Sequence, residues 1–302
     1  MSKKIIVGIT LAFLTALISG MANFFAKIAV SKIEPVFFTT IKNVIVFFII
    51  IAFFIFKKNR HQLTVITKRD LPALAAIGIF GGAIPFYLFF SGLTEVPAIN
   101  AALIHKSLLI WVTILAVPFL KETINYKLLA AIVLLYTSNF VIGGFNGFKF
   151  SSGEMMILVA TWLWAIENII AKKTLSRLSP LVISGARMGI GALVLFLIAA
   201  FQNRLIPLGT FSPDQWNLII LTSALLFGYV ITWYTALQIL PVTVTASILV
   251  FATLVTNLLS AIFVTGKLQF VDVIQSIMII SATILIITEM KVRAASGKLS
   301  LS

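Results

Sequence analysis

The sequence predicts an all-α integral membrane protein whose ten transmembrane helices form two inverted five-helix repeats. Three observations support this prediction. Of the 302 residues, 60% are hydrophobic and only 11% are charged, which is far from the composition of a soluble globular domain. Hydrophobic windows of about 20 residues, enough to cross a bilayer core of roughly 30 Å, recur along the chain. Finally, the chain matches itself when shifted by 145 residues.

The hydrophobic windows and the polar breaks between them place ten spans, each to within a few residues. We expect these spans at about 5–30, 35–56, 71–92, 97–119, 126–144, 154–172, 180–201, 216–237, 241–264 and 270–290. The first window follows Lys3 and Lys4 and continues past the small residues near Gly20, so we interpret it as a retained helix and not a signal peptide. Two longer polar segments, 57–70 and 202–215, are too short to hold a domain.

The basic residues orient the spans. Ten spans put both termini on one side, and that side then receives 15 of the 23 Lys and Arg residues, against four on the other side: Lys3, Lys4, Lys57, Lys58, Arg60, Lys68, Arg69, Lys121, Lys127, Lys172, Lys173, Arg177, Lys291, Arg293 and Lys298 against Lys32, Lys149, Arg204 and Lys267. This bias predicts cytoplasmic termini, with 291–302 as a cytoplasmic tail, in the inner (plasma) membrane. It also explains the net charge of +14 without any nucleic-acid partner.

The chain contains no cysteine, so it has no disulfide framework and no cysteine-based zinc, haem-attachment or iron–sulfur motif. We therefore expect no cofactor and no metal. The expected partners are the lipid bilayer and a small-molecule substrate, with the chain acting as a monomer or a homodimer.

The internal match is strongest near the end of the first span. Under the 145-residue shift the segment 23–27 falls on 168–172, Pro35 falls on Pro180, and Lys42 falls on Arg187. Each half holds an odd number of helices, so the second half must cross the membrane upside down relative to the first. The sequence therefore predicts inverted repeats over 5–144 and 153–290.

Several short motifs occur in a recognisable order: Asn23-Phe24-Phe25-Ala26-Lys27, Pro35 followed by Lys42, the run Gly81-Gly82-Ala83-Ile84-Pro85-Phe86, Leu120-Lys121-Glu122, Trp164-Ala165, and Pro180 followed by Arg187. In these residues the chain resembles the drug/metabolite transporter (DMT) superfamily, EamA-like family, with two EamA domains. The resemblance implies a ten-helix carrier whose central cavity alternates between the two membrane faces. Family members mostly export amino acids, purines or other metabolites, and related families exchange sugar phosphates or nucleotide sugars. Lys267 departs from the family pattern, which usually has Glu there, and Lys42 stands where Arg is common.

Charged residues inside the predicted spans are candidate site residues, because each one costs a few kcal/mol on insertion scales. Lys42 and Lys106 lie in the outer half of the membrane with no acidic residue at their depth. An anionic group on the substrate would complete a site there. The alternative has Lys42 and Lys106 in structural contacts such as packing against helix-terminal carbonyl groups, without substrate contact. For Lys27 we expect snorkelling to the interface.

Glu167 lies near the cytoplasmic end of its span, and Arg187 lies about 10 Å into the next span from the same side, so the two are at similar depth. One interpretation is a structural ion pair that closes this hairpin. The other makes Glu167 a proton-coupling carboxylate or a ligand for a substrate amine. His105 is a possible proton relay, with a hydrogen-bonded structural histidine as the alternative.

Several aromatic residues lie too deep for an interfacial belt. Tyr87, Trp164 and Trp233 are candidates for a stacking wall in the substrate cavity, with ordinary core packing as the alternative.

These features favour a secondary transporter of a small polar metabolite, either an amino acid or an organic or phosphorylated anion. A lipophilic cation is disfavoured because only Glu167 lies deep enough to meet its charge. No phosphate-binding loop of the ATPase type occurs, so transport is facilitated or coupled to an ion gradient. The alternatives are a membrane-embedded enzyme, which the two histidines and the lack of a Gly-x-Ser-x-Gly motif disfavour, and a structural or receptor protein.

Overall fold

A computed structural model describes residues 2–56, 61–141, 147–205 and 207–295. Every regular element in these ranges is helical, which confirms the predicted fold class. The elements are α1 (Lys3–Val30), α2 (Pro35–Phe56), α3 (His61–Thr64), α4 (Leu71–Gly82), α5 (Ile84–Leu93), α6 (Ala98–Lys106), α7 (Leu108–Leu120), α8 (Tyr126–Thr137), η2 (Ser138–Val141), α9 (Ser152–Thr174), α10 (Pro180–Phe201), η3 (Leu208–Thr210), α11 (Pro213–Ile239), α12 (Val242–Leu249), α13 (Ala252–Ser260), η4 (Ala261–Thr265) and α14 (Phe270–Ala295).

The predicted spans correspond to these elements. Nine helical segments in the described ranges are long and apolar enough to cross a membrane, and the fifth predicted span is the shorter apolar helix Tyr126–Val141. The rest of that predicted span, 142–144, lies outside the described residues. So do Lys57, Lys58, Arg60 and Lys298 of the predicted basic face and 296–302 of the predicted tail.

Three spans that we expected as continuous helices are interrupted. The third breaks at Ala83 between α4 and α5, and the fourth breaks at Ser107 between α6 and α7. The ninth breaks at Val250 and Phe251, between α12 and α13. Hydropathy windows report only apolar length, so they do not detect such breaks inside a span.

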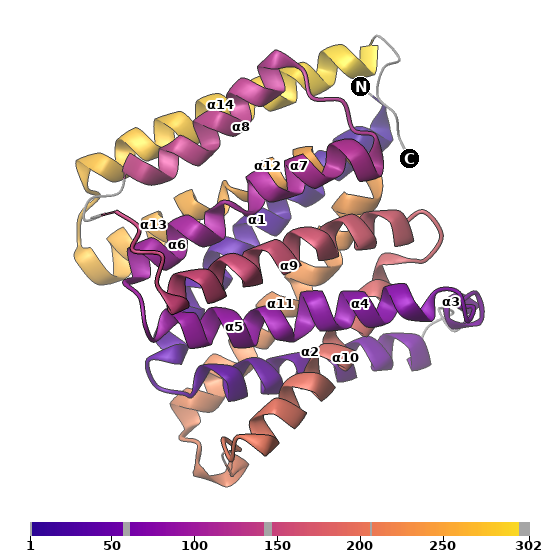
Figure 1. Ribbon diagram of the computed structural model, residues 1–302, viewed down its shortest axis with the longest axis vertical. Helices are drawn as coiled ribbons and strands as arrows, with labels where there is room; N and C mark the ends of the chain where they lie inside the picture. Colours follow the sequence, from indigo (N-terminus) through magenta and orange to yellow (C-terminus); the bar gives the residue numbers. More distant parts are fainter. Residues whose placement is uncertain (1, 57–60, 142–146, 206, 296–302) are drawn as a thin grey trace.

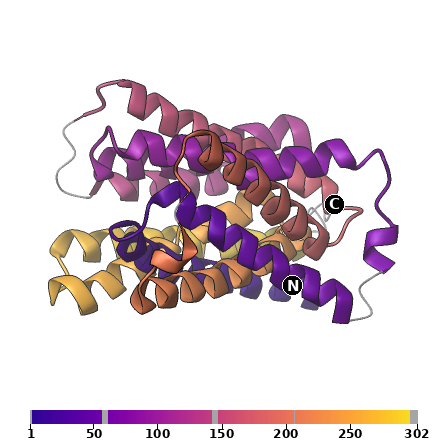
Figure 2. The same cartoon turned by 90° about the horizontal axis from the view of Figure 1, so that it is seen from below.

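The helices pack as an inverted repeat requires. Under an exchange of the two halves, α1 corresponds to α9, α2 to α10, and α4–α5 to α11. The packed pair α1 with α11 then corresponds to α9 with α5, and α10 with α4 corresponds to α2 with α11. The pairs α2 with α10 and α8 with α14 correspond to themselves, and they lie at opposite edges of the bundle (Figures 1 and 2).

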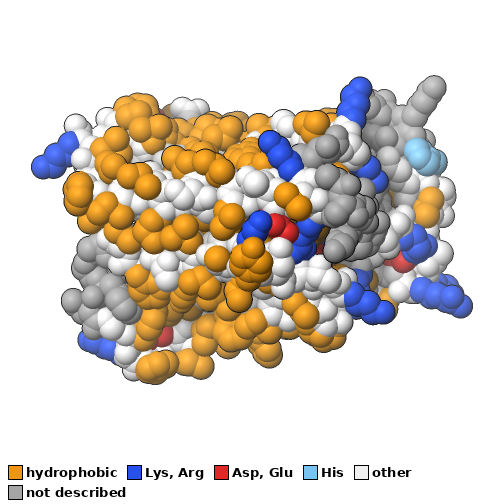
Figure 3. Space-filling model, turned by 90° about the horizontal axis from the view of Figure 1, so that it is seen from above, with side chains coloured by type: hydrophobic (Ala, Val, Ile, Leu, Met, Phe, Trp, Pro, Cys, Tyr) orange, Lys and Arg blue, Asp and Glu red, His pale blue; other side chains and the backbone are white. Residues whose placement is uncertain are grey.

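The outer surface of the bundle suits a lipid environment. Exposed apolar side chains are spread over much of the face shown in Figure 3, with charged side chains at both ends and a few near its middle. Lys and Arg side chains gather at the end where α1 begins and α9, α11 and α14 end. We call this the basic end and the other the opposite end.

Hydrogen bonds of polar side chains link the helices at the basic end. The Glu122 carboxylate, in the loop after α7, accepts from the backbone N–H groups of Val242 and Thr243 at 2.6 and 3.2 Å, at the start of α12. A carboxylate at this point complements the positive end of the helix dipole. Lys267, which follows Glu122 by 145 residues, is exposed at the opposite end.

Lys172 stabilises the same end with a positive charge, placed at the C-terminus of a helix. It was expected among the interfacial basic residues, but its side chain is buried. Its ammonium group donates to the carbonyl oxygens of Leu237 and Leu240, at 2.9 and 3.0 Å, where α11 ends. These carbonyl groups have no partner within the helix, and they carry the negative end of its dipole.

Candidate functional site

The break in the third span is built from its own sequence. Pro85 has no backbone N–H, so the carbonyl oxygen of Gly81, four residues earlier, loses its helical donor. The indole Nε1 of Trp164 on α9 donates to that oxygen at 3.3 Å. The neighbouring carbonyl oxygen of Gly82 accepts from Nδ2 of Asn43 on α2 at 3.1 Å. Side chains of two other helices therefore donate hydrogen bonds to the carbonyl groups at the break.

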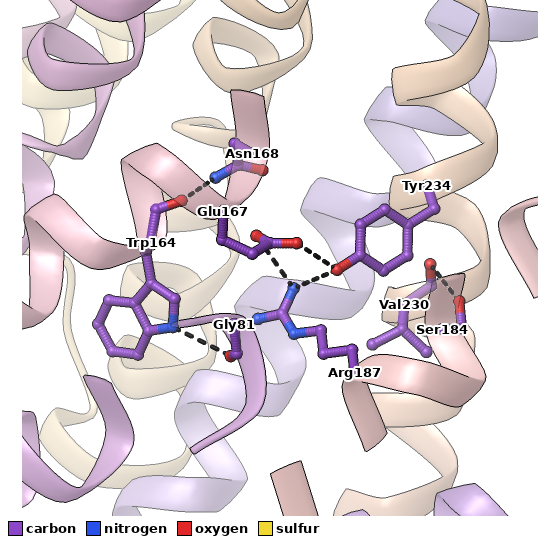
Figure 4. Close-up of polar contacts among 8 residues, drawn as sticks. All are labelled: Gly81, Trp164, Glu167, Asn168, Ser184, Arg187, Val230 and Tyr234. Atoms are coloured by element: carbon purple, nitrogen blue, oxygen red, sulfur yellow. Dashed lines mark hydrogen bonds and ion pairs between the residues drawn. The ribbon is translucent and has the colours of Figure 1, made fainter. Parts of the chain in front are cut away.

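Beside this break, three helices meet in a buried polar cluster of Glu167, Arg187 and Tyr234 (Figure 4). The hydroxyl of Tyr234 on α11 donates to one carboxylate oxygen of Glu167 on α9 at 2.6 Å. Nη1 of Arg187 on α10 donates to the Tyr234 oxygen at 3.1 Å and lies 3.8 Å from the second carboxylate oxygen. All three residues are buried, so the charges of the pair neutralise each other away from water.

Glycines make room for this cluster. A Cβ atom at Gly81 would lie 2.8 Å from Cγ of Glu167, so the carboxylate chain packs directly on the α4 backbone. A Cβ atom at Gly82 would lie 2.2 Å from the carbonyl oxygen of Arg187 and 2.9 Å from Cα of Gly191. The close approach of α4 to α10 therefore requires glycine at this position.

Trp164 joins the polar cluster to an aromatic one. Its ring centroid lies 4.9 Å from that of His105 on α6 and 5.2 Å from that of Phe86 on α5. Phe89 contacts both Trp164 and His105. The Nδ1 atom of His105 is buried without a hydrogen-bond partner among the described residues. The structure thus packs the His105 ring against the rings of Phe89 and Trp164.

Lys106 lies at the break of the fourth span, as the last residue of α6. No ion pair or hydrogen bond of its ammonium group occurs among the described residues. The ninth span breaks at the equivalent place in the second repeat, where Val250 and Phe251 stand. Paired interruptions of this kind, near the middle of two repeat-related spans, typically mark the substrate site of a carrier.

Lys42 lies on α2 with its ammonium group 4.3 Å from the centroid of the Phe38 ring. This cation–π contact is its one polar partner within the described ranges, which contain no carboxylate in ion-pair distance. The Lys42 side chain therefore differs from that of its repeat counterpart Arg187, which pairs with Glu167.

The other two predicted wall residues, Tyr87 and Trp233, have partners of their own. The Tyr87 hydroxyl accepts from Nε2 of Gln202 at 2.8 Å at the opposite end of the bundle. Trp233 is buried in the core and stacks on Tyr229 along its own helix, with ring centroids 6.2 Å apart and planes 7° apart. Of the predicted aromatic wall, only Trp164 lies in the cluster that joins a helix break to the ion pair.

A pocket of about 240 Å³ borders the break of the fourth span. Its lining is mainly apolar and comes from α6, α7, α8 and α9, from the break at Ser107 and from the segment before α9: Ile104, Ser107, Ile110, Trp111, Tyr136, Phe148, Phe150, Glu154, Met155 and Leu158. Ser107 of the break contributes to it, but none of the predicted site residues does.

Comparison with known proteins assigns the chain to a family. The sequence pattern of the EamA-like transporter family matches residues 6–144 and 151–288, which together make up most of the chain. The chain belongs to the EamA-like transporter family. It is therefore a multi-pass membrane protein of a transporter family, as the resemblance in the sequence predicted.

Individual relatives of this EamA-like chain carry the same general description. An "uncharacterized transporter" of Archaeoglobus fulgidus is 26% identical over 198 residues, which are 65% of this chain and 67% of that protein. The "uncharacterized transporter YyaM" of Bacillus subtilis is 28% identical over 152 residues, 48% of this chain and 49% of its own length. The chain thus spans half to two thirds of these relatives.

A solved crystal structure shares the fold of this EamA-like transporter. The two superpose with a TM-score of 0.78, over 92% of this chain and 95% of the other, at 14% sequence identity. At that identity the likeness concerns the helix arrangement alone.

Two elements of the polar cluster were not predicted from the sequence. Tyr234 is not among the predicted site residues, because no spacing rule links it to a carboxylate 67 positions earlier. The carbonyl group of Gly81, which has no partner within its helix, has a detectable signal in Pro85, which removes its helical donor. The partner of that carbonyl group, Trp164, follows only from the packing of α9 on α5.

Proposed function

We propose that this protein is a secondary transporter that moves a small polar metabolite by alternating access, with the solute bound where the interrupted spans meet. The observation that supports this most directly is Lys106. It is a cation at a helix break inside the membrane, and no carboxylate of the described residues pairs with it. An uncompensated cation at this depth is costly, and an anionic group on the solute would offset that cost.

Lys42 is the second proposed solute contact, from the first repeat. Trp164 is the third, since its ring lies beside His105 next to a helix break. Tyr87 and Trp233 have the weaker case, because their side chains contact Gln202 and Tyr229.

We further propose that Glu167 and Arg187 act as a structural pair and not as a coupling site. Both oxygens of Glu167 face donors of other helices, and the pair holds α9, α10 and α11 together. His105 would then be the remaining candidate for proton transfer, because its buried Nδ1 atom has no partner in the described structure.

Transport across a purified bilayer tests this function. The full chain is reconstituted into liposomes, and uptake and efflux of radiolabelled amino acids, organic anions and phosphorylated metabolites are measured. We expect at least one solute to move, and we expect Lys106→Ala and Lys42→Ala to reduce that movement strongly. Unchanged transport in both variants would remove the two lysines from the site.

The proposed orientation has its own test. The basic end is expected to face the cytoplasm of a plasma membrane, with both termini on that side. Reporter fusions that are active only in the cytoplasm, placed after α14 and in the segment 202–212, should give opposite signals. A cytoplasmic signal from the second fusion would reverse the topology.

A further inference from the structure

The positions of the carboxylates bear on the charge of the transported solute. The chain has nine Asp and Glu residues, and all nine lie in the described ranges. Three lie at the basic end (Asp70, Glu122 and Glu289) and five at the opposite end (Glu34, Glu95, Glu154, Asp214 and Asp272). Only Glu167 lies well inside a span.

The three carboxylates of the basic end are engaged in structural contacts. Asp70 accepts from the backbone N–H of Thr67 and pairs with Arg177. Glu122 holds the start of α12, as described above. Glu289 accepts from Nε of Arg293 at 2.9 Å and from the side chain of Asn125.

Four of the five carboxylates at the opposite end are engaged in the same way. Their donors are the backbone N–H of Phe37 for Glu34, Ser152 for Glu95, Asn100 for Glu154, and Asn257 for Asp272. The fifth, Asp214, is exposed in the first turn of α11. None of these groups lies at the depth of Lys42 or Lys106.

Glu167 is occupied as well, because Tyr234 and Arg187 face its two oxygens. Two of the backbone carbonyl groups that the helix breaks set free are also covered, since Trp164 and Asn43 donate to those of Gly81 and Gly82. The interior that the structure describes therefore offers no free carboxylate to a substrate ammonium group. An ammonium group left unpaired at this depth would carry a penalty of a few kcal/mol.

Unlike the carboxylates, two of the four cations discussed inside the bundle have no partner among the described residues. Arg187 is balanced by Glu167, and Lys172 by the carbonyl groups at the end of α11. Lys42 and Lys106 have no such partner among the described residues. The interior of the bundle thus holds two positive charges without counter-charge.

Comparison of the two repeats shows which partners of Arg187 have no polar equivalent for Lys42. The shift of 145 residues that places Lys42 on Arg187 also places Ala22 on Glu167. A shift of 144, which aligns the third and eighth spans, places Phe90 on Tyr234. The first repeat therefore has apolar residues at the positions that correspond to both polar partners of the arginine. The first repeat keeps the cation of this cluster and omits its anion.

We propose that the solute is a net anion without an ammonium group, and that its carboxylate or phosphate pairs with Lys42 in the place that Glu167 takes beside Arg187. This inference rests on the proposed transport function and narrows its substrate class. Amino acids, which carry an ammonium group beside their carboxylate, are excluded by it. The shared chemistry of the favoured solutes is an anionic oxygen group.

Matched solute pairs test the inference on the reconstituted full chain. Lactate and alanine, malate and aspartate, and 3-phosphoglycerate and phosphoserine differ in each pair only by a hydroxyl against an ammonium group. In any pair that is transported, we expect the hydroxy member to enter about tenfold faster or more, given the penalty for an unpaired ammonium group. The third pair separates phosphates from carboxylates.

The outcomes distinguish the two proposals. An amino member that enters as fast as its hydroxy partner, or faster, overturns the anion inference and leaves a transporter. Failure of all six solutes to enter overturns the proposed transport of small polar metabolites together with the inference.

Variants at Lys42 and Ala22 test the placement. Lys42→Met should reduce transport of the preferred anion about tenfold, whereas Lys27→Met, which alters an exposed lysine of the preceding helix, should not. Ala22→Glu would give Lys42 the internal partner that Arg187 has, so it should transport the anion several-fold more slowly than Ala22→Gln. Size-exclusion profiles identify variants that do not fold. Folded Ala22→Glu protein that transports as fast as Ala22→Gln would overturn the placement.

Discussion

The indole of Trp164 replaces a missing backbone donor, with its Nε1 atom 3.3 Å from the carbonyl oxygen of Gly81. The contact joins two helices through a group that Pro85 leaves without a helical partner. It also sets the position of the Trp164 ring, which lies beside His105 on one face and Phe86 on another.

Replacing Trp164 with Phe should therefore destabilise the protein by more than the loss of area suggests. The change keeps an aromatic ring but leaves the Gly81 carbonyl group unsatisfied, which typically costs about 1–3 kcal/mol. Thermal unfolding in detergent measures the loss as a lower midpoint. Trp162→Phe, on the exposed face of the same helix, is the matched control, and equal midpoints for the two variants would contradict the role of this hydrogen bond.

The buried ion pair predicts strong coupling between its two members. Glu167→Gln leaves Arg187 buried without its counter-charge, and removal of one partner of such a pair typically costs about 3–5 kcal/mol. The double variant Glu167→Gln with Arg187→Met should recover part of that loss, because it removes both charges. A double-mutant cycle based on thermal or denaturant unfolding checks this, and additive effects would show that the two side chains do not interact.

A methyl group at Gly82 should separate α4 from α10. The Cβ atom of Gly82→Ala would lie 2.2 Å from the carbonyl oxygen of Arg187, so the two backbones must move apart. We expect a large drop in the yield of folded protein and in its thermal midpoint. Gly209→Ala is the control, because nothing lies within 4 Å of a Cβ atom there. A Gly82→Ala protein as stable as this control would argue against close packing.

Glu122 should stabilise the first turn of α12 against local opening. In Glu122→Gln the backbone N–H groups of Val242 and Thr243 lose a charged acceptor, and hydrogen bonds to charged groups typically contribute about 1.5–3 kcal/mol. Hydrogen exchange of this segment, followed by mass spectrometry, should become faster. Glu95→Gln, an exposed change at the opposite end, should leave the exchange of α12 unaltered. Unchanged exchange in Glu122→Gln would contradict the contact.

The sequence predicts much of this fold because a membrane imposes strong rules. Apolar length predicts the spans, and the shift that pairs Pro35 with Pro180 predicts their inversion. Counting residues from the span ends places Glu167 and Arg187 at one depth, and the structure has them 3.8 Å apart. These predictions need only local or periodic features of the chain, and a single sequence contains such features.

Contacts that depend on packing between distant helices were not predictable in the same way. Lys172 has an ordinary interfacial position in the sequence, yet it inserts among the last carbonyl groups of α11. The break at Ser107 has no proline, so no residue type marks it. Tyr234 becomes part of the polar cluster only because α11 brings its hydroxyl to Glu167.

The contact between Glu122 and the start of α12 has a consequence for the two membrane faces. The two ends have the same arrangement of helices. Where Glu122 binds the N-terminus of α12 at the basic end, the repeat-related residue at the opposite end is an exposed lysine, Lys267. The N-terminus of α12 at the basic end is thus held by charge-assisted hydrogen bonds, whereas a lysine at the related position offers no carboxylate to the N-terminus of α6 at the opposite end.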